Sequence, residues 1–262
     1  MKKFRSPQRP KKSQLVVGLE PIVEEIKNGQ AFEKIFVDVK AVSTFQQIRT
    51  IASSNNIPIS MVPAEKLKTF NVENHQGIVA LRSKISYYRL EDLINWSLEQ
   101  TTSPLLLMLD GITDIRNIGG LARTALCTGV HGIIIPEKGV GALNEDAILT
   151  SAGALEQIAI CRTASLLKAV DEVHAHGFQV IGSEMTAAQP VYGVDLTPPT
   201  VIIMGGEEKG IHPAVLKACD LRCNIPMQNN FESLNVSVAA GMVLYEAMLQ
   251  RSKARPAKNR NV

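Results

Sequence analysis

The chain has 262 residues, 45% hydrophobic and 20% charged, with a net charge of +3, which is typical of a globular protein large enough for two domains. No apolar run reaches the roughly 18 residues of a transmembrane helix, and the basic N-terminus lacks the apolar stretch of a secretory signal. The four cysteines form no C-x-x-C pair, which disfavours a disulfide framework or a zinc site, so we expect a cytoplasmic protein with no metal and no membrane contact.

Basic residues are concentrated at the two ends of the chain. Residues 1–12 and 251–262 hold 11 of the 28 basic residues and no acidic one, which leaves 17 basic residues against 25 acidic ones elsewhere. The net charge of residues 13–250 is therefore about −8, and both ends of the chain are positive. Such ends suit a polyanion, because each phosphate contact releases counterions, although a role in solubility alone fits equally well. We expect a disordered basic tail at 1–13 and a second basic tail at 253–262.

Residues 14–84 have the pattern of a small α/β domain. Apolar residues at helical spacing predict a helix over 15–28, and Asn28-Gly29 would stop it. Shorter elements then alternate: strand 34–39, helix 44–55, strand 57–62, helix 64–70 and strand 77–82. His75 precedes the last strand in a loop, where it is either structural or a contact for a polar ligand.

A second domain is expected over 104–252, after a linker at 85–103 that includes a short helix over 90–98. Its first segment, Pro104–Leu109, is a continuous apolar run and predicts a buried parallel strand. A polar loop follows, and we expect the next helix to begin near Gly119. That start would place Arg123 in the first turns, where a positive charge costs about 0.3–1 kcal/mol. Arg123 therefore either has an anionic partner or is simply solvated.

The rest of this domain alternates strands and helices in the manner of a doubly wound α/β fold. We expect strands at 132–135, 158–160, 179–183, 200–204 and 223–225, and helices at 144–151, 165–176, 213–218 and 236–249. Gly139-x-Gly141-x-x-Asn144 matches part of a dinucleotide fingerprint, but its third glycine is missing, so a turn is favoured.

Polar groups and glycines follow three of the apolar strands. Asn117 and Arg123 come after the first, Gly205-Gly206-Glu207 after another, and the stretch from Ile225 to Asn235 after the last. Ser233 or Asn235 is expected to cap the final helix. Ligands of open α/β folds bind where strand carboxyl ends meet helix N-termini, which predicts a crevice for a nucleotide-like ligand. The motifs of P-loop kinases, H-E-x-x-H proteases and nucleophile-elbow hydrolases are absent from the sequence.

Three motifs in this order resemble those of the SpoU (TrmH-like) branch of the SPOUT RNA methyltransferases. They are Asp110-Gly111…Asp114-x-x-Asn117-x-Gly119…Arg123, then Met204-Gly205-Gly206-Glu207…Gly210, then Ile225-Pro226-Met227…Ser233-Leu234-Asn235-Val236-Ser237. Residues 14–84, including His75-Gln76-Gly77, resemble the ribosomal-protein-like RNA-binding domain of the same family. One departure is Ile115, where the family often has proline.

This resemblance implies a parallel sheet with helices on both faces, a C-terminal trefoil knot, and a homodimer. It implies transfer of a methyl group from S-adenosylmethionine to a ribose 2′-hydroxyl of structured RNA, most consistently 23S ribosomal RNA, without a metal. The expected cofactor contacts are Gly205, Gly206, Ile225, Met227 and Leu234.

The resemblance also implies five catalytic residues. Arg123 would activate or orient the hydroxyl, and Asn117 would hold Arg123 or the RNA. Glu207 would position the second loop, and Ser233 and Asn235 would orient the acceptor ribose or Arg123.

Three other readings of the sequence stay open. The same chemistry could act on transfer RNA, although the extra N-terminal domain favours ribosomal RNA. The scaffold could serve as a non-catalytic RNA-binding or ribosome-assembly protein, which the intact polar positions disfavour. A nicotinamide oxidoreductase is disfavoured by the broken Gly139-x-Gly141 pattern.

Overall fold

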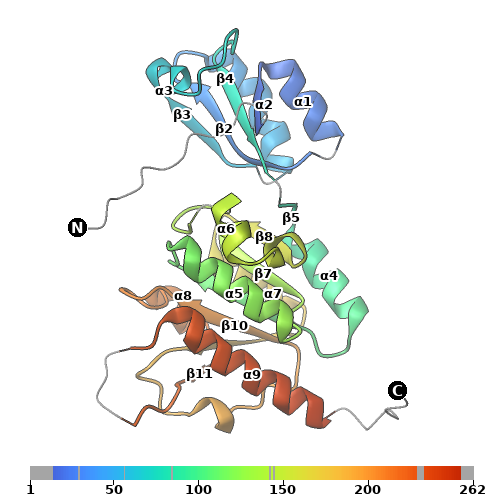
Figure 1. Ribbon diagram of the computed structural model, residues 1–262. Coiled ribbons are helices and arrows are strands. Elements are labelled where there is room, and N and C mark those ends of the chain that lie inside the picture. The colour runs from blue at the N-terminus through green and yellow to red at the C-terminus, as the bar shows by residue number, and fades with distance from the viewer. Residues whose placement is uncertain are drawn as a thin grey trace, which may run out of the picture. The chain divides into compact units, whose positions relative to one another are not determined.

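The computed structural model describes residues 14–28, 30–55, 57–83, 85–141, 143, 145–228 and 233–254. The chain forms two compact units, Met1–Ser86 and Tyr87–Val262, and each is described by itself (Figure 1). Five segments for which the sequence carries expectations lie outside the described residues. They are 1–13, Gly29, Asn144, the polar run Asn229–Glu232 and 255–262.

The first unit is a four-stranded sheet in the order β1-β4-β2-β3. Strand β4 is antiparallel to β1 and β2, whereas β2 and β3 are parallel. Helices α1 and α2 bury Ile22 and Ile48 in one cluster with strand residues, and α3 buries Leu67 in another with Leu15 and Val79. The elements are β1 (Leu15–Val17), α1 (Leu19–Lys27), β2 (Phe32–Asp38), α2 (Val42–Ser54), β3 (Ile59–Val62), α3 (Ala64–Lys68) and β4 (Ile78–Arg82).

The expectation of one helix over 15–28 was wrong in its first residues. Leu15–Val17 pairs antiparallel with β4, opposite Leu81 to Val79. Gly18, at φ 86°, then separates this strand from α1. A positive φ favours glycine, and here it lets the chain leave the sheet and begin the helix at once.

The second unit is a seven-stranded sheet in the order β11-β9-β10-β6-β7-β8-β5, and all its neighbouring strands are parallel. This confirms the predicted α/β fold with a parallel sheet. The strands are β5 (Tyr87–Tyr88), β6 (Leu105–Asp110), β7 (Gly132–Pro136), β8 (Ala159–Thr163), β9 (Gln179–Ser183), β10 (Thr200–Gly205) and β11 (Leu221–Cys223). The helices are α4 (Leu90–Gln100), α5 (Ile115–Cys127), α6 (Glu145–Thr150), α7 (Leu166–Ala175), α8 (Pro213–Lys217) and α9 (Val236–Ala254).

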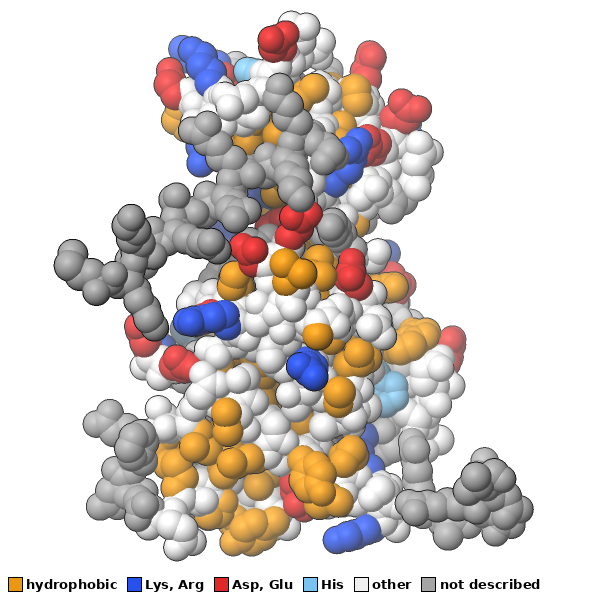
Figure 2. Space-filling view, in the orientation of Figure 1, with side chains coloured by type: hydrophobic (Ala, Val, Ile, Leu, Met, Phe, Trp, Pro, Cys, Tyr) orange, Lys and Arg blue, Asp and Glu red, His pale blue; other side chains and the backbone are white. Residues whose placement is uncertain are grey.

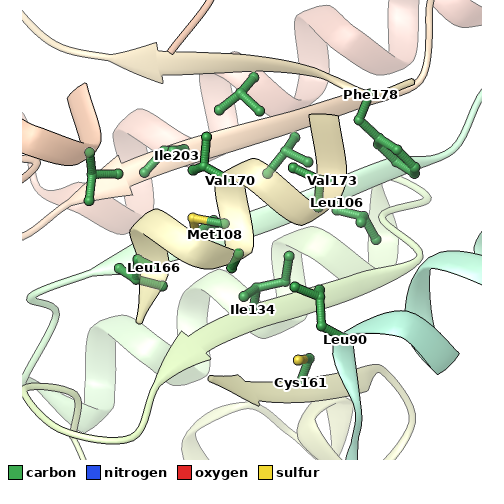
Figure 3. Close-up of a cluster of buried hydrophobic side chains, with 14 of the residues drawn as sticks. Leu90, Leu106, Met108, Ile134, Cys161, Leu166, Val170, Val173, Phe178 and Ile203 are labelled. Atoms are coloured by element: carbon green, nitrogen blue, oxygen red, sulfur yellow. The ribbon is translucent and has the colours of Figure 1, made fainter. Parts of the chain in front are cut away.

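Helices cover both faces of this sheet. Leu106 and Met108 of β6 lie in one buried cluster with α4, α7 and α8 (Figure 3). Because successive strand residues point to opposite faces, the buried Leu105, Leu107 and Leu109 point to the other face. Helices α5 and α9 lie along that other face (Figure 1). Both helices therefore begin near the carboxyl ends of the strands.

The segment 85–103, expected as a linker, contributes two elements to the second unit. Strand β5 adds a parallel pair with β8 at the edge of the sheet. Helix α4 buries Leu90, Leu93 and Ile94 against the sheet, because these residues recur on one helical face.

Helix α5 begins earlier than the sequence suggested. It begins at Ile115, where Asp114 caps it by accepting a hydrogen bond from the Arg116 backbone N–H over 2.8 Å. The last strand is also displaced, since β11 ends at Cys223 rather than at Ile225. Among the described residues, no helix is both long and apolar enough to cross a membrane.

Candidate functional site

The loops after β6 and β10 lie against each other at the carboxyl edge of the second sheet. Gly205 pairs with Asp110 in the parallel register, and the Gly206 backbone N–H donates to the Asp110 carbonyl over 2.8 Å. A Cβ on Gly206 would lie 2.4 Å from the Gly111 carbonyl oxygen, closer than any side chain tolerates. Gly206 thus lets the two loops touch.

Gly205 is required for contact within its own loop. A Cβ there would lie 2.2 Å from the backbone carbon of Gly210 and 2.3 Å from the backbone nitrogen of Ile211. The sequence suggested that these glycines admit a ligand to the backbone. In the structure the space beside each Cα is filled by backbone of the protein itself: by Gly111 of the loop after β6 for Gly206, and by Gly210 and Ile211 of the same loop for Gly205.

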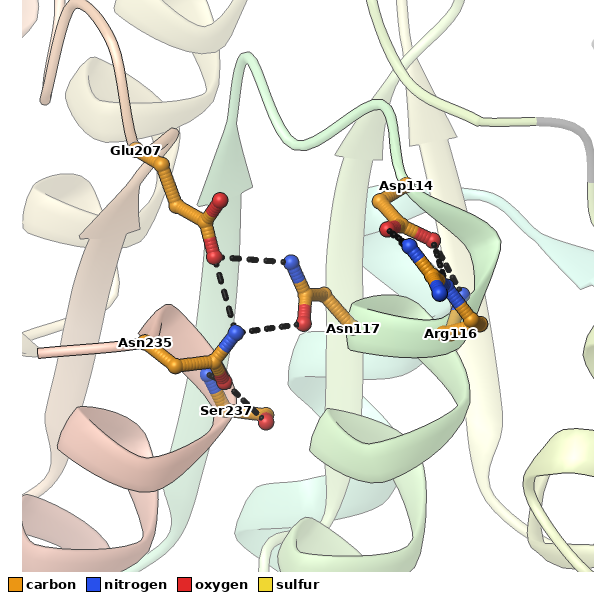
Figure 4. A network of polar contacts seen from close by, with 6 residues as sticks. All are labelled: Asp114, Arg116, Asn117, Glu207, Asn235 and Ser237. Atoms are coloured by element: carbon orange, nitrogen blue, oxygen red, sulfur yellow. Dashed lines mark hydrogen bonds and ion pairs between the residues drawn. The ribbon is translucent and has the colours of Figure 1, made fainter. Parts of the chain in front are cut away.

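Polar side chains from three separate segments of the chain meet at this edge of the sheet (Figure 4). Asn117, in the first turn of α5, donates its side-chain N–H to Glu207 Oε1 over 3.1 Å. Asn235 donates to the same oxygen over 2.8 Å and to Asn117 Oδ1 over 2.9 Å. The structure therefore brings together three of the five residues that the resemblance named as catalytic.

The orientation of the Asn235 amide is set by Ser237. The backbone N–H and the hydroxyl of Ser237 both donate to Asn235 Oδ1, over 3.0 and 2.5 Å. This caps α9, as expected for one of the two candidate residues, and it directs the amide N–H groups towards Glu207. Ser237 was missed as a site residue. Its position two residues after a capping asparagine is the signal that would have found it.

A cavity of about 400 Å³ lies beside this network, between the loops after β9, β10 and β11. All five expected cofactor contacts line it, with Ser233 and Glu207. Its walls include the apolar side chains of Met204, Ile211, Ile225 and Met227. The full lining is Ser183, Glu184, Met185, Thr186, Met204, Gly205, Gly206, Glu207, Lys209, Gly210, Ile211, Ile225, Met227, Ser233, Leu234, Val236 and Ala239.

The segment Ser183–Thr186 is a part of this first cavity that the sequence did not indicate. It follows β9, which lies between β10 and β11 in the sheet. The segment carries no motif, and only the strand order shows that its end belongs at the site.

A second cavity, of about 360 Å³, is lined by Asn117 and Glu207 of the network. It is more polar than the first cavity and borders the start of α5. Its lining is Gly111, Ile112, Thr113, Asp114, Asn117, Gly139, Gly206, Glu207, Glu208, Lys209, Gly210 and Val236. The two cavities share Gly206, Glu207, Lys209, Gly210 and Val236, so they meet at the Glu207 loop.

Arg123 lies apart from both cavities. It is the ninth residue of α5 rather than a first-turn residue, so the helix-dipole argument for an anionic partner was wrong. Its side chain is exposed, and no described residue forms a hydrogen bond or ion pair with it. Within one chain, the residue expected to activate the hydroxyl therefore does not reach the Asn117–Glu207–Asn235 network.

A charged pair flanks the second cavity. The Arg116 guanidinium donates to the Asp114 carboxylate over 2.6–3.1 Å, and these bonds lower the pKa of Asp114. The pKa of Arg116 is raised, first by Asp114 and also by the charge of Glu207. Charges of both signs therefore lie close to Glu207, and Asp114 of this pair lines the second cavity.

The glycine pair that resembled a dinucleotide fingerprint lies beside the same loops. Gly139, at φ 79°, lines the second cavity, and a Cβ on Gly141 would lie 2.4 Å from the Thr113 carbonyl oxygen. These glycines form a turn packed against the loop after β6, in keeping with the turn that the sequence favoured.

The His75 loop of the first unit is held by its own backbone. The Gly77 backbone N–H donates to His75 Nδ1 over 3.1 Å, which leaves Nε2 as the protonated nitrogen of the neutral ring. Asn74 and Gln76 have φ of 52° and 49°, which non-glycine residues adopt uncommonly. The loop therefore presents amide groups and one imidazole donor in a fixed conformation. Within the part of the chain that the structure describes, no group of three His, Cys, Asp or Glu residues could hold a metal ion.

Comparison with known proteins decides the family. Residues 104–245, more than half of the chain, match the SpoU rRNA methylase family. The chain belongs to the SpoU methylase family. Residues 15–88 match the RNA 2′-O ribose methyltransferase substrate-binding domain, which spans most of the first unit. The site described above thus lies in the SpoU methylase domain.

Two relatives match this chain over nearly their whole length. YacO of Bacillus subtilis, assigned to the TrmH family of tRNA/rRNA methyltransferases, is 32% identical over 238 residues, covering 90% of this chain and 96% of YacO. A TrmH-family relative from Staphylococcus aureus is 32% identical over 240 residues, with the same coverage.

Solved structures share the fold. The SpoU methyltransferase AviRb of Streptomyces viridochromogenes, in complex with AdoMet, has a TM-score of 0.57 and 23% identity over 92% of this chain and 91% of AviRb. The TrmH/SpoU tRNA modifying enzyme of A. aeolicus has a TM-score of 0.53 and 27% identity over 65% of this chain and 88% of its own.

Proposed function

We propose that this SpoU-family protein transfers a methyl group from S-adenosylmethionine to a ribose 2′-hydroxyl of RNA. One observation supports this most: two cavities of different character meet at the loop of Glu207, whose carboxylate is bound by Asn117 and Asn235. The first cavity has the more apolar walls, and the second is the more polar of the two. A methyl donor in one and a ribose in the other would face each other across Glu207.

The residues of the first cavity fit the cofactor. Ile225, Met227 and Leu234 offer apolar surface for an adenine ring, and the loop of Gly205 and Gly206 offers backbone groups for polar atoms. The cofactor would supply a methyl group on a positively charged sulfur, which is a good leaving group without Lewis-acid help. Ser233 lines the same cavity, and its proposed role is to orient the acceptor ribose or Arg123.

We propose ribosomal RNA, and 23S in particular, as the substrate, met in the cytoplasm. The first unit matches a substrate-binding domain, and a separate binding domain suits a large structured RNA. The basic ends add a sequence-independent attraction to phosphates. The relatives are named for both tRNA and rRNA, so transfer RNA is the competing substrate. A non-catalytic scaffold is disfavoured, because Asn117, Glu207 and Asn235 form a connected hydrogen-bond network beside both cavities.

A second copy of the chain would cover the outer face of α9. Val238, Met242 and Tyr245 lie on one side of this helix, 48%, 45% and 53% exposed. Figure 2 shows hydrophobic side chains gathered over the part of the second unit where Figure 1 places α9. An exposed apolar patch of this kind typically marks an interface. We propose a homodimer that buries this face.

The dimer would also complete the site. Helix α5 packs beside α9, since a Cβ on Gly120 would lie 3.2 Å from Ser237 and one on Gly241 would lie 3.8 Å from Thr124. Arg123 is the neighbour of Thr124 and is exposed beside this face. We propose that Arg123 of one protomer orients the hydroxyl or a phosphate of the RNA bound at the other protomer's cavities.

The C-terminal trefoil knot expected from the resemblance remains part of this proposal. The path of the chain supports the knot. Strand β11 lies at the edge of the sheet, next to β9, and the chain then returns so that Asn235 contacts Asn117 and Glu207.

A methylation assay tests the function. Purified protein, radiolabelled S-adenosylmethionine and transcripts of 23S RNA, 16S RNA and transfer RNA would be incubated, and the RNA digested with alkali. We expect label in alkali-resistant dinucleotides of 23S RNA, because a 2′-O-methyl group blocks cleavage at the next phosphate. Label in base-modified nucleotides, or no transfer to any RNA, would contradict the proposal.

Ala239→Trp tests where the cofactor binds. Ala239 is half-buried and lines the first cavity from α9, so a large ring there should fill it. A substitution at Gly205 would be less informative, because its Cβ would lie 2.2 Å from the backbone carbon of Gly210 and would distort the loop itself. We expect calorimetry to show S-adenosylmethionine binding in the wild type and in Ala239→Ser, and no binding in Ala239→Trp. Equal binding in all three would place the cofactor elsewhere.

A further inference from the structure

The two carboxylate oxygens of Glu207 have different surroundings. Oε1 accepts the side-chain N–H groups of Asn117 and Asn235, over 3.1 and 2.8 Å. Oε2 has no hydrogen bond or ion pair with any described residue. In Figure 4 it points away from both asparagines. One oxygen is therefore held by the protein, and the other is left available.

The orientation of this carboxylate is determined by a chain of directed bonds. Ser237 occupies Asn235 Oδ1 with two donors, so the Asn235 amide nitrogen must face Glu207 and Asn117. Asn117 Oδ1 accepts from Asn235, so the Asn117 nitrogen also faces Glu207. Both N–H groups point at one oxygen, and turning the carboxylate would break both bonds. Oε2 is thereby pre-positioned.

Glu207 also lies where the two cavities meet. Of the five residues that line both cavities, two are glycines, one is valine and one is lysine. A lysine ammonium only donates hydrogen bonds, whereas an ionised carboxylate only accepts them. Among the described residues on this shared wall, Glu207 is the side chain able to take a proton from a group in the second cavity.

Arg123 is poorly suited to that role. It lines neither cavity, and a guanidinium is not deprotonated in proteins. An arginine supplied by the partner protomer could orient the RNA and stabilise charge, but it would still not accept the proton. The reaction therefore requires another acceptor close to the hydroxyl.

We propose that Glu207 Oε2 accepts the proton of the acceptor ribose 2′-hydroxyl, with the ribose bound in the second cavity. This inference rests on the proposed methyltransferase function. The Glu207 carboxylate takes the proton as the ribose oxygen forms a bond to the methyl carbon. The carbon–sulfur bond breaks and its electron pair remains on sulfur. A carboxylate and a sulfonium become a carboxylic acid and a neutral thioether, and the proton passes to water when products leave.

The competing explanation is that Glu207 only positions its loop. Glu207→Gln separates the two, because the amide oxygen of glutamine can accept both asparagine N–H groups. The network would be kept, and only the free oxygen would be replaced by an NH₂ group, which donates. A positioning role predicts near-normal turnover in this variant. A proton-accepting role predicts its loss.

The experiment compares single-turnover methyl transfer in the wild type, Glu207→Gln and the control Glu99→Gln, an exposed charge change on α4. We expect Glu207→Gln to lower the rate about 100-fold or more. Calorimetry and RNA-binding assays should give dissociation constants for cofactor and RNA within about twofold of the wild type, and Tm should be unchanged. Glu99→Gln should match the wild type in every readout.

The pH profile supplies a second readout. The wild-type rate should fall on the acid side of the pH profile, because a protonated carboxyl group cannot accept the proton of the hydroxyl. We call this fall the acid limb, and the residual rate of Glu207→Gln should not show it. Other charges near Glu207 are Asp114 and Arg116 at the start of α5, and Glu208 and Lys209 in its own loop. Asn235, which caps α9, and Val236, its first residue, carry no charge. If Glu207→Gln does not fold, Glu207→Asp should be slower than wild type and keep the acid limb.

The outcomes are distinct. Turnover of Glu207→Gln within about fivefold of the wild type, or an acid limb that persists in that variant, would overturn the inference while leaving the proposed function intact. Absence of methyl transfer in the wild type on every RNA would overturn the proposed function and this inference together. If Glu207→Gln does not fold, loss of the acid limb in Glu207→Asp would overturn the inference.

Discussion

The side-chain amide of Asn235 donates to the carboxylate of Glu207 over 2.8 Å and so joins the start of α9 to the loop after β10. Asn235→Asp would still cap the helix but would replace the donor with a second carboxylate beside Glu207. A hydrogen bond to a charged group contributes about 1.5–3 kcal/mol, so methyl transfer should fall about 10–150-fold.

Asn235→Ser provides the comparison, since serine also caps but does not bring a charge. Thermal melting should show a larger loss of stability in Asn235→Asp than in Asn235→Ser, because only the former sets like charges together. Equal rates in the wild type and Asn235→Asp would show that the bond is not used in the reaction.

Arg123→Ala should abolish methyl transfer and leave cofactor binding intact, because Arg123 lines neither cavity. Its action across the dimer is tested by mixing this variant with Ala239→Trp. In a mixed dimer, the Arg123→Ala chain keeps its cofactor cavity and receives Arg123 from its partner. We expect the mixture to regain activity that neither variant has alone. No recovery, with mixed dimers demonstrated, would place Arg123 at its own chain's site.

Met242→Arg should convert the dimer to a monomer, because it places a charge in the centre of the apolar face of α9. Sedimentation would measure the oligomeric state and the same samples would be assayed for methyl transfer, which should be lost with the dimer. Leu149→Arg is the matched control, since Leu149 is 77% exposed on α6. A wild-type protein that sediments as a monomer would contradict the proposed interface.

Asp114 makes the start of α5 sensitive to acid. Its pKa is lowered by hydrogen bonds from Arg116, so its contribution to the free energy of unfolding is fully present above its ordinary pKa of 3.8 and is lost as pH falls through the lower, folded-state value. Asp114→Ala should lose about 1 kcal/mol at pH 7 from the missing cap. The difference in Tm between wild type and variant should shrink as the pH falls below 3.8. Asp114→Asn keeps a capping group that does not titrate. The difference in Tm between Asp114→Asn and Asp114→Ala should therefore not shrink in the same pH range.

Removal of residues 1–12 and 255–262 should weaken RNA binding and flatten its dependence on salt, because fewer phosphate contacts release fewer counterions. Arg251 must be spared. Although it lies within the basic C-terminal stretch, it donates to the carbonyls of Leu196 and Pro198 over 2.8 and 2.7 Å and so belongs to the folded body. Binding titrations at several salt concentrations would measure the slope. An unchanged slope would assign the phosphate contacts to the body instead.

Local patterns in the sequence were enough to predict the parallel sheet and its ligand-binding edge. Continuous apolar runs such as 105–109 and 200–204 read as buried strands because both of their faces are covered. Polar residues and glycines directly after those runs marked the strand ends. Since the carboxyl ends of parallel strands lie at one edge, Asn117, Glu207 and Asn235 were expected in one crevice, and the three motifs pointed to one family.

Tertiary structure decided which of these residues touch. Asn117 and Asn235 are 118 residues apart in the sequence, yet the Asn235 side-chain nitrogen lies 2.9 Å from Asn117 Oδ1. This contact is set by the packing of α5 beside α9 rather than by any local propensity. The same packing leaves Arg123 outside the cavities, although the sequence places it in the same motif as Asn117. The strand order likewise brings Ser183–Thr186 to the site without a motif. Periodicity and capping act within a few residues, whereas a hydrogen-bonded network forms only after distant segments have packed.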